Sequence, residues 1–512
     1  MRKLLLASAA MLGAASGIAV AQPAPSQGQL ISPANPVTPS SSFDASNAYG
    51  QPSTYAGAMK YNPLALPTPG TIVIHLGGKV EVDMDAIWSP YNTTQSGVAG
   101  SAKLNPISFG AYMRLYPGID GMATNGLRYG ASVELRENFP GSAAQQTPAI
   151  APAPSGSAYS SGQTVFVRRA FVYVAADNIG LVRLGTTDGV LGLFDNCIFT
   201  NQCWDAGSGI FNGGMMQGQD VAGVNPPFVW LSQAGAEYGN VKVTYLSPQF
   251  FGFDFGVQYA PGMGNGYGAC SPVIPLGGTG GPATNNNNQA SSFCNQTTTG
   301  IDPTRWYNQV GVGVRWQGSF GPVDAGLFAF YEAASKETFF GPAVNNNLGL
   351  AGNRFDNLSF VSAATYIKGN LPFGSLTWAM DYIGGALNGQ LAMRPTGGAS
   401  ENAIVTGLTF NNGPLTMGLS LAMIESQGSN SLTHVSQRKE EEIAFGGMYN
   451  VAPGLYFAAE YMYMQRHQGG FDFASGANGV GSTGVPGTAT WRAGLTRDSR
   501  AQGILFATVV NW

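Results

Sequence analysis

The stretch Thr71–Trp88, TIVIHLGGKVEVDMDAIW, decides the fold because apolar and polar side chains alternate along its whole length. Successive side chains of a β-strand point to opposite faces, so the stretch predicts one long strand with two different faces. A strand of a soluble sandwich also alternates, but it rarely keeps the pattern for so long. The apolar face consists of Ile72, Ile74, Leu76, Gly78, Val80, Val82, Met84, Ala86 and Trp88. The opposite face includes His75, Lys79, Glu81, Asp83 and Asp85.

The same two-residue period recurs through the rest of the chain. It is seen in residues 107–116, 127–136, 253–259, 306–316, 415–423 and 455–463. The apolar face is too uniform for water and the polar face needs water, and a barrel with a wet interior satisfies both. A small barrel or a sandwich would instead fill its interior with apolar side chains. The sequence therefore predicts an all-β fold, a transmembrane antiparallel β-barrel over residues 71–512.

The predicted connections between strands alternate in length. Short ones lie at residues 176–180, 247–250, 318–322, 370–374, 411–414 and 451–454, and long ones near 138–163, 188–226, 260–304, 333–354, 387–401, 426–439 and 466–500. Short periplasmic turns opposite long extracellular loops are typical of outer-membrane barrels. Counting the hairpins in this way predicts about 16 strands.

The first 70 residues differ from the rest. Arg2 and Lys3 precede an apolar stretch that ends in Ala19-Val20-Ala21, which predicts a signal peptide over residues 1–21, with a membrane anchor as the alternative. Residues 22–70 are rich in Pro and Ser and have no apolar period, so we expect a disordered leader. No later apolar run approaches the roughly 18 residues that a membrane-spanning helix needs.

Composition agrees with a barrel that faces lipid. Of the 512 residues, 72 are Gly, 11% are aromatic and only 10% are charged, against about 25% charged in ordinary soluble domains. The formal net charge is -4, so no basic excess points to nucleic acid. The slight acidic balance indicates a mild preference for cations.

The four cysteines, Cys197, Cys203, Cys270 and Cys294, lie in two of the predicted long loops. An exported chain meets an oxidising compartment, so disulfides are expected, and four cysteines allow three connectivities. We favour the local pairs Cys197–Cys203 and Cys270–Cys294, because both members of each pair lie in one loop. A metal site is disfavoured because the spacing is not CxxC and no histidines cluster nearby.

Signals for enzymatic chemistry are absent from the sequence. It contains no G-x-S-x-G, H-E-x-x-H or P-loop motif, and its three histidines, His75, His434 and His467, are far apart. We therefore expect no catalytic activity, no cofactor and no bound metal.

Several short motifs resemble those of the Gram-negative general porins. They are Arg168–Val172 followed by Val182–Gly189, then Tyr245–Pro248 with Phe251–Tyr259. The chain also ends on an aromatic residue, Trp512, which resembles the outer-membrane assembly signal of barrel proteins, although Phe is more usual there. The resemblance implies a homotrimer in the outer membrane, in contact with lipid and lipopolysaccharide and inserted by the barrel-assembly machinery. It also implies passive diffusion of small hydrophilic solutes and ions, and a third loop that folds into the barrel.

The resemblance further implies which residues line the pore. In the family, basic residues on the wall face acidic residues on the third loop. Carried over to this sequence, the wall candidates are Lys79, Arg114, Arg128, Arg136 and Arg168, and the loop candidates are Asp188, Asp195 and Asp205. Alternation with Arg168 predicts that Arg169 points outward.

Three other functions stay open at this point. A sugar-preferring porin would use inward aromatics such as Tyr112, Tyr116 and Phe328 as a stacking surface. A barrel enzyme would need a nucleophile and a base, which the scarcity of histidine disfavours. A structural or adhesive surface protein would have a plugged barrel and no conductance.

Overall fold

The computed structural model describes residues 67–88, 106–138, 165–176, 179–195, 240–262, 306–336, 356–388, 392–394, 396–427, 437–468, 471–472, 477–478 and 498–512. The predicted signal peptide (1–21), most of the predicted leader (22–70) and all four cysteines lie outside the described residues. The predicted start of the ordered domain at Thr71 coincides with the first residue of the first strand.

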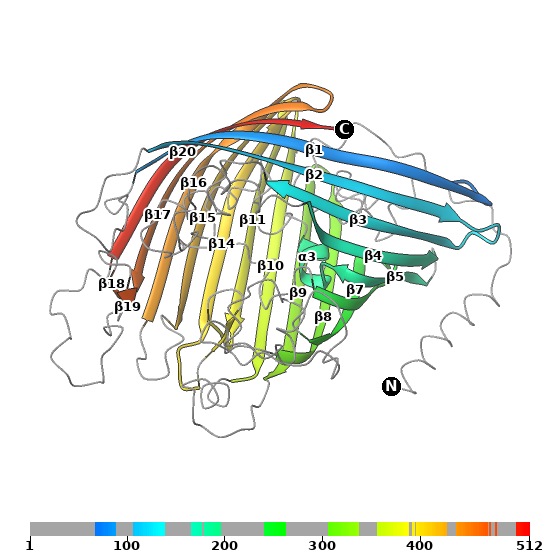
Figure 1. The fold of residues 1–512 in the computed structure, drawn as a ribbon, viewed down its shortest axis with the longest axis horizontal. Helices are drawn as coiled ribbons and strands as arrows, with labels where there is room; N and C mark the ends of the chain where they lie inside the picture. Colours follow the sequence, from blue (N-terminus) through cyan, green and yellow to red (C-terminus); the bar gives the residue numbers. More distant parts are fainter. Residues whose placement is uncertain are drawn as a thin grey trace, which may run out of the picture.

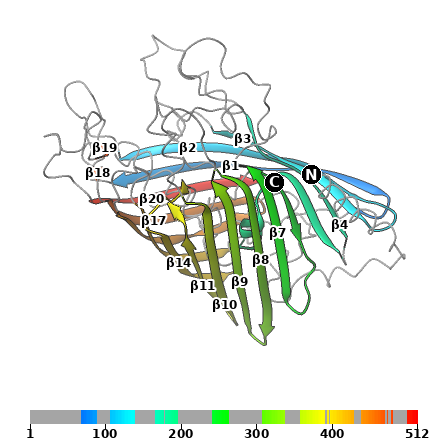
Figure 2. The same cartoon turned by 90° about the horizontal axis from the view of Figure 1, so that it is seen from below.

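The described strands form a closed antiparallel barrel of 16 strands in which each strand pairs with its neighbours in chain order (Figures 1 and 2). The predicted fold class and strand count are therefore confirmed. The barrel strands are β1 (Thr71–Trp88), β2 (Ile107–Met122), β3 (Arg128–Asn138), β4 (Phe166–Ala176), β5 (Gly180–Thr187), β6 (Asn240–Leu246), β7 (Phe253–Gly262), β8 (Trp306–Phe320), β9 (Val323–Lys336), β10 (Leu358–Leu371), β11 (Gly374–Gly385), β14 (Glu401–Asn412), β15 (Leu415–Gln427), β16 (Gln437–Ala452), β17 (Leu455–Gln468) and β20 (Asp498–Asn511).

Three smaller elements lie within long connections. A six-residue helix, α3 (Val190–Asp195), follows β5. Two short hairpins, β12 (Leu387–Asn388) with β13 (Ala392–Met393) and β18 (Phe471–Asp472) with β19 (Ala477–Asn478), follow β11 and β17. Within the described part of the chain, no helix is long and apolar enough to cross a bilayer.

The barrel closes where the last strand meets the first. β20 pairs with β17 on one side and β1 on the other, and the C-terminus lies beside β1 in Figure 1. Gly78 and Trp512 exchange two backbone hydrogen bonds of 3.0 Å across this seam. Closure leaves no unpaired strand edge, which a sheet surrounded by lipid requires. The predicted assembly-signal residue thus lies at the closing seam.

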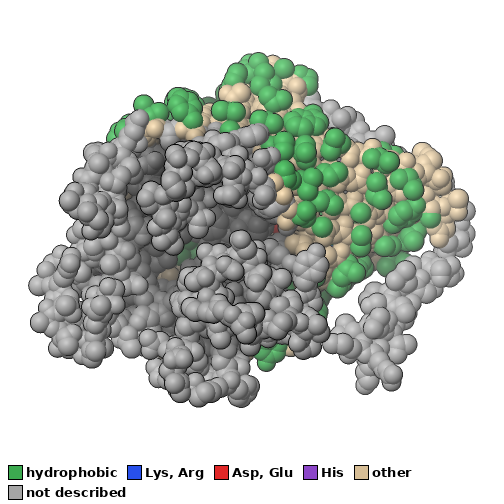
Figure 3. Space-filling view, viewed as in Figure 1, with side chains coloured by type: hydrophobic (Ala, Val, Ile, Leu, Met, Phe, Trp, Pro, Cys, Tyr) green, Lys and Arg blue, Asp and Glu red, His purple; other side chains and the backbone are tan. Residues whose placement is uncertain are grey.

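The two faces of the wall differ as the alternation predicts. Outward positions are exposed and apolar, for example Ile74 (81% exposed) and Phe109 (62% exposed). Inward positions on the same strands, such as Glu81 and Arg114, are buried. Hydrophobic side chains and backbone cover most of the described surface that is visible in Figure 3. Lipid outside and polar groups inside explain the two-residue period of the sequence.

The predicted orientation of Arg169 is wrong. Glu134 of β3 pairs with Arg169, but the next residue, Leu135, pairs with Val167, so Arg168 is an extra residue in β4. Such a β-bulge shifts the alternation by one residue. Val167 is therefore exposed, whereas Arg169 is only 1% exposed and points into the barrel.

Candidate functional site

Three of the predicted basic wall residues lie in one row across neighbouring strands. Lys79 of β1 is directly opposite Arg114 of β2, and Arg114 is directly opposite Arg136 of β3. Lys79 and Arg114 are both buried on the inner face, and the Lys79 ammonium lies 2.7 Å from the carboxylate of Glu81. The side chain of Arg136 lies outside the described part of the structure.

The other two predicted wall residues are not part of this row. Arg128 is the first residue of β3, near the turn to β2, and it is half-buried. Arg168 is the bulge residue of β4, and its side chain is not among those described. Its neighbour Arg169 instead makes two ion pairs inside the barrel, to Glu134 at 3.3 Å and to Asp188 at 2.7 Å.

The structure describes only the beginning of the predicted acidic loop. Asp188 lies between β5 and α3 and is engaged by Arg169. Asp195 ends α3, but its side chain is not described, and Asp205 lies outside the described residues. Of these three carboxylates, only that of Asp188 is therefore among the described side chains.

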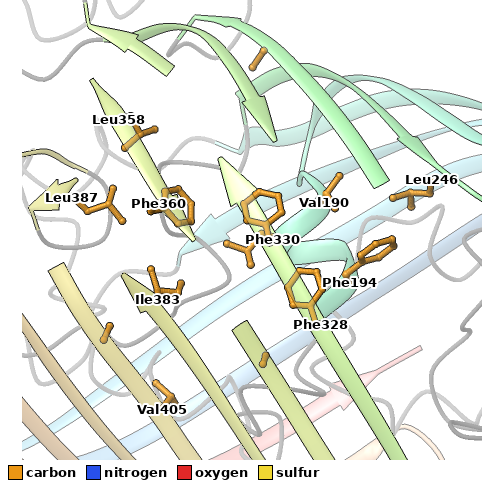
Figure 4. Close-up of a cluster of buried hydrophobic side chains, with 14 of the residues drawn as sticks. Val190, Phe194, Leu246, Phe328, Phe330, Leu358, Phe360, Ile383, Leu387 and Val405 are labelled. Carbon is orange, nitrogen blue, oxygen red and sulfur yellow. The ribbon is translucent and has the colours of Figure 1, made fainter. Parts of the chain in front are cut away.

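Helix α3 begins the third long connection and lies inside the barrel. It packs against β8 and also contacts β7 and β9. Val190 and Leu191 are fully buried, and Phe194 packs edge-to-face on Phe328 of β9 at 5.9 Å between ring centroids (Figure 4). The described part of this connection confirms the prediction of a third loop that folds inward. Because Phe328 is covered by α3, it does not offer a free stacking surface for a sugar.

Both ends of α3 are held by polar side chains of the wall. At its start, the backbone N–H of Val190 donates to the Gln258 amide oxygen, and the Gln258 amide nitrogen donates to Glu332 at 3.1 Å. At its end, Arg315 donates to the carbonyl oxygen of Phe194 at 3.3 Å.

Arg315, which holds the end of α3, makes several further contacts. Its Nη2 donates to Asp254 at 2.6 Å and its Nε at 3.1 Å, which is a bidentate pair. The guanidinium carbon also lies 4.6 Å from the centre of the Phe194 ring, within the range of a cation–π contact. One buried side chain thus links β7 and β8 to the third connection.

A second polar cluster lies near the short-turn end of β1 to β4. His75 lies 3.0 Å from Asp120, and the Tyr173 hydroxyl donates to the same carboxylate. The ring of Tyr173 crosses over Gly130 of the intervening strand β3. A Cβ at position 130 would lie 2.5 Å from Tyr173 Cε1 and even closer to the carbonyl oxygen of Ile119.

Replacing Gly130 with alanine is expected to destabilise the barrel by about 1–3 kcal/mol, the usual cost of overpacking a close contact. The added methyl group would have to displace both the Tyr173 ring and backbone of β2. Urea unfolding in detergent micelles measures the loss. Gly369→Ala is the matched control, because a Cβ there would lie 4.0 Å from its nearest neighbour, the Leu376 carbonyl oxygen. Equal stability of the two variants would contradict this account of the contact.

Several charged residues of the interior were not among the predicted site residues. Arg183 of β5 is fully buried, and its guanidinium carbon lies 4.9 Å from the centre of the Phe171 ring. Lys242 of β6 and Arg315 of β8 are also buried on the inner face. Alternation along the strands is the signal that would have identified them, since each faces the same side as its buried neighbours two residues away.

Opposite charges are unevenly distributed around the inner wall. Among the described residues, the six buried Lys and Arg side chains all lie on β1 to β8. The thirteen buried carboxylates include seven on β9 to β17, which are Asp324, Glu332, Asp381, Glu401, Glu440, Glu442 and Glu460. Among the described buried side chains, those on β1 to β8 are therefore mixed in charge, and those on β9 to β17 that carry a charge are acidic. The described residues include no group of His, Cys, Asp and Glu side chains arranged to hold a metal ion.

A closed barrel that is apolar outside and charged inside defines a channel protein of an outer membrane. The family comparison agrees, because the family model for Gram-negative porins matches residues 7–469. The chain belongs to the Gram-negative porin family, and it forms an outer-membrane channel for passive diffusion. No curated protein gave a match.

Solved structures with a similar fold include three outer-membrane proteins. OmpT of Vibrio cholerae is 10% identical, with a TM-score of 0.42, and the match covers 87% of this chain and 100% of OmpT. Salmonella typhi OmpF, in a complex with daunomycin, is 13% identical, with a TM-score of 0.45 and coverage of 86% and 97%. The channel DcaP of Acinetobacter baumannii is 11% identical, with a TM-score of 0.44 and coverage of 88% and 100%.

Proposed function

We propose that the channel passes small hydrophilic solutes and ions and that it favours cations over anions. The observation that carries this proposal is the excess of carboxylates over Lys and Arg among the described side chains that are buried inside the barrel, thirteen against six. Charges that line a narrow, partly desolvated channel decide which ions enter it, whereas charges on distant loops are screened by salt. The inner carboxylates therefore matter more for selectivity than the net charge of the chain.

The carboxylates of β16 and β17 are the best candidates for this role. Glu440, Glu442 and Glu460 are all buried on the inner face, and they lie on the neighbouring strands β16 and β17. Carboxylates on the wall of a channel attract cations and repel anions. They also lie on the part of the wall where the described residues include no buried Lys or Arg.

We further propose that an electric field crosses the channel from a basic to an acidic side. Its basic side is formed by the predicted wall residues Lys79, Arg114, Arg128, Arg136 and Arg168. In this proposal they face the acidic wall of β9 to β17 across the interior, and Asp195 and Asp205 add charge to the third loop. Asp188 contributes less, because Arg169 neutralises it at 2.7 Å. A transverse field of this kind orients polar solutes and disfavours apolar ones.

Replacing both Glu442 and Glu460 with glutamine is expected to lower the permeability ratio of K⁺ to Cl⁻ by about twofold, because two inner charges are lost. The reversal potential of planar bilayers in a KCl gradient measures this ratio. Glu441→Gln is the matched control, since Glu441 lies on the same strand but on the opposite face and pairs with Lys439 at 3.0 Å. An unchanged ratio in the double variant, or an equal fall in the control, would contradict the proposal.

The proposal also covers assembly and the absence of chemistry. We expect a homotrimer in contact with lipid and lipopolysaccharide, inserted by the barrel-assembly machinery, with no catalytic activity and no cofactor. Membership of a porin family supports each of these points. A sugar-preferring pore remains the alternative, since Tyr116 is an inward aromatic residue. Concentration-dependent block of the single-channel current by sugars would favour that alternative.

A further inference from the structure

The connection that joins β11 to β14 turns into the barrel immediately after β11. β11 ends at Gly385, where a side chain would collide with the backbone of Phe360 on β10. The next residue, Ala386, donates its N–H to the carbonyl oxygen of Ser359 at 2.6 Å. Leu387, the first residue of β12, is then fully buried.

Leu387 packs on an apolar patch of the inner wall. It belongs to one cluster with inward residues of four strands, and Figure 4 shows it facing Phe360 and Ile383. The inward residues of this patch are Leu358, Phe360, Ile383, Val405 and Ile424. An apolar patch is unexpected on a wall that faces water, and Leu387 gives it a partner.

The position of β12 also places it on the inner side of the wall. β12 contacts both β10 and β15, which are separated by three strand spacings in the barrel. Three spacings correspond to about 14 Å along the wall. A two-residue element can contact both strands only from the inner, concave face of the wall, where the curvature brings β10 and β15 closer together.

A polar contact holds the other end of this connection at the rim. Arg394, just after β13, donates from Nε at 2.9 Å and from Nη2 at 2.5 Å to one oxygen of Asp356, which precedes β10. The Asp356 N–H donates to the Arg394 carbonyl oxygen at 2.9 Å, and Arg394 Nη1 donates to Ser400 at 2.6 Å. Arg394 therefore ties the hairpin to the beginnings of both β10 and β14.

We propose that the described residues of this connection, 386–388, 392–394 and 396–400, form a second element that narrows the channel, separate from the third loop, and that Arg394 is its positioning residue. α3 contacts β7 to β9 and β12 contacts β10 and β15, so the two elements cover adjoining sectors of the inner wall. In this proposal the solute path runs beside the strands that neither element is shown to contact, from β16 through β20 and β1 to β6. Lys79, Arg114, Glu442 and Glu460 all lie on that sector.

Single-channel recording in planar bilayers tests this proposal with two variants and one control. Arg394→Gln removes the attachment at the rim, and Leu387→Ser removes the apolar contact at the other end. Each is expected to raise the conductance about 1.5-fold and to add brief substates, because the hairpin no longer holds one position. Lys439→Gln is the control. It also removes one positive charge, but from a partly exposed residue near the beginning of β16 that pairs with Glu425 and Glu441.

The outcomes separate a positioning role from an effect of charge or of folding. Wild-type conductance in both Arg394→Gln and Leu387→Ser would overturn the proposal, and so would an equal change in Lys439→Gln. The shift in gel mobility on heating shows which variants are folded. If Arg394→Gln does not fold, the neutral change at Leu387 decides the question alone. General porin function survives either result, because α3 and the wall charges are unaffected.

Discussion

Replacing Arg169 with methionine is expected to lower the free energy of unfolding by about 3–5 kcal/mol. Arg169 is 1% exposed and lies between two carboxylates, Glu134 at 3.3 Å and Asp188 at 2.7 Å. Removing the Arg169 guanidinium takes an ion-pair partner away from each of two neighbouring carboxylates in a buried site. The effect is large because burial denies the carboxylates the water that would otherwise solvate them.

Urea unfolding in detergent micelles, followed by tryptophan fluorescence, measures this loss. The matched control is the triple variant Arg169→Met, Glu134→Gln, Asp188→Asn, which removes the charges together and is expected to recover most of the stability. Replacing a whole buried ion pair is often close to neutral, whereas breaking it is costly. A single variant that is as stable as wild type would mean that Arg169 does not hold these carboxylates.

Removing Arg315 and Asp254 together is expected to change conduction more than any other change near the third loop. The double variant Arg315→Gln, Asp254→Asn removes the ion pair without leaving a buried charge, so folding is largely spared. It also removes the hydrogen bond to the Phe194 carbonyl at 3.3 Å and the contact with the Phe194 ring at 4.6 Å. Without them the end of α3 is no longer fixed to the wall, and we expect about twofold higher conductance and closure at lower voltage.

Single-channel recording over a range of voltages measures both effects. Asp254→Asn alone is the control, because it keeps Arg315 and its two contacts with Phe194. Wild-type conductance in the double variant would show that α3 is held without Arg315. The same change in the control would assign the effect to the Asp254 charge instead of the position of α3.

The two inward elements make the two sides of the interior different. α3 and the β12 hairpin both rest on the side from β7 to β15, where the wall carries large apolar residues such as Phe330 and Phe360. The opposite side carries buried charged residues, including Lys79 and Arg114. The apolar residues on the inner wall therefore pack against the protein's own loops. Because the loops cover them, they are compatible with a water-filled path on the other side.

Part of the site was predictable from residue type and from the alternation of side chains between the two faces of each strand. Lys79 and Arg114 lie on the inner face because β1 and β2 alternate without interruption in this region. Arg169 was placed on the wrong face because a bulge becomes visible only when β4 is paired with β3. The carboxylates of β16 and β17 obey the alternation too, but their importance depends on which residues face them across the barrel.

The sequence by itself determined the class of fold, the number of strands and the face of most residues. The reason is that two solvents act on each strand separately, so the two-residue period is a local property that any segment of about ten residues displays. Only the tertiary structure decided which face each side chain of β4 points to, the path of α3 and the apolar patch on which Leu387 packs. Each of these depends on contacts between residues far apart in the chain, as between Arg315 and Phe194, which are separated by 121 positions. No local pattern records such a contact, because its energy arises only after the barrel has closed.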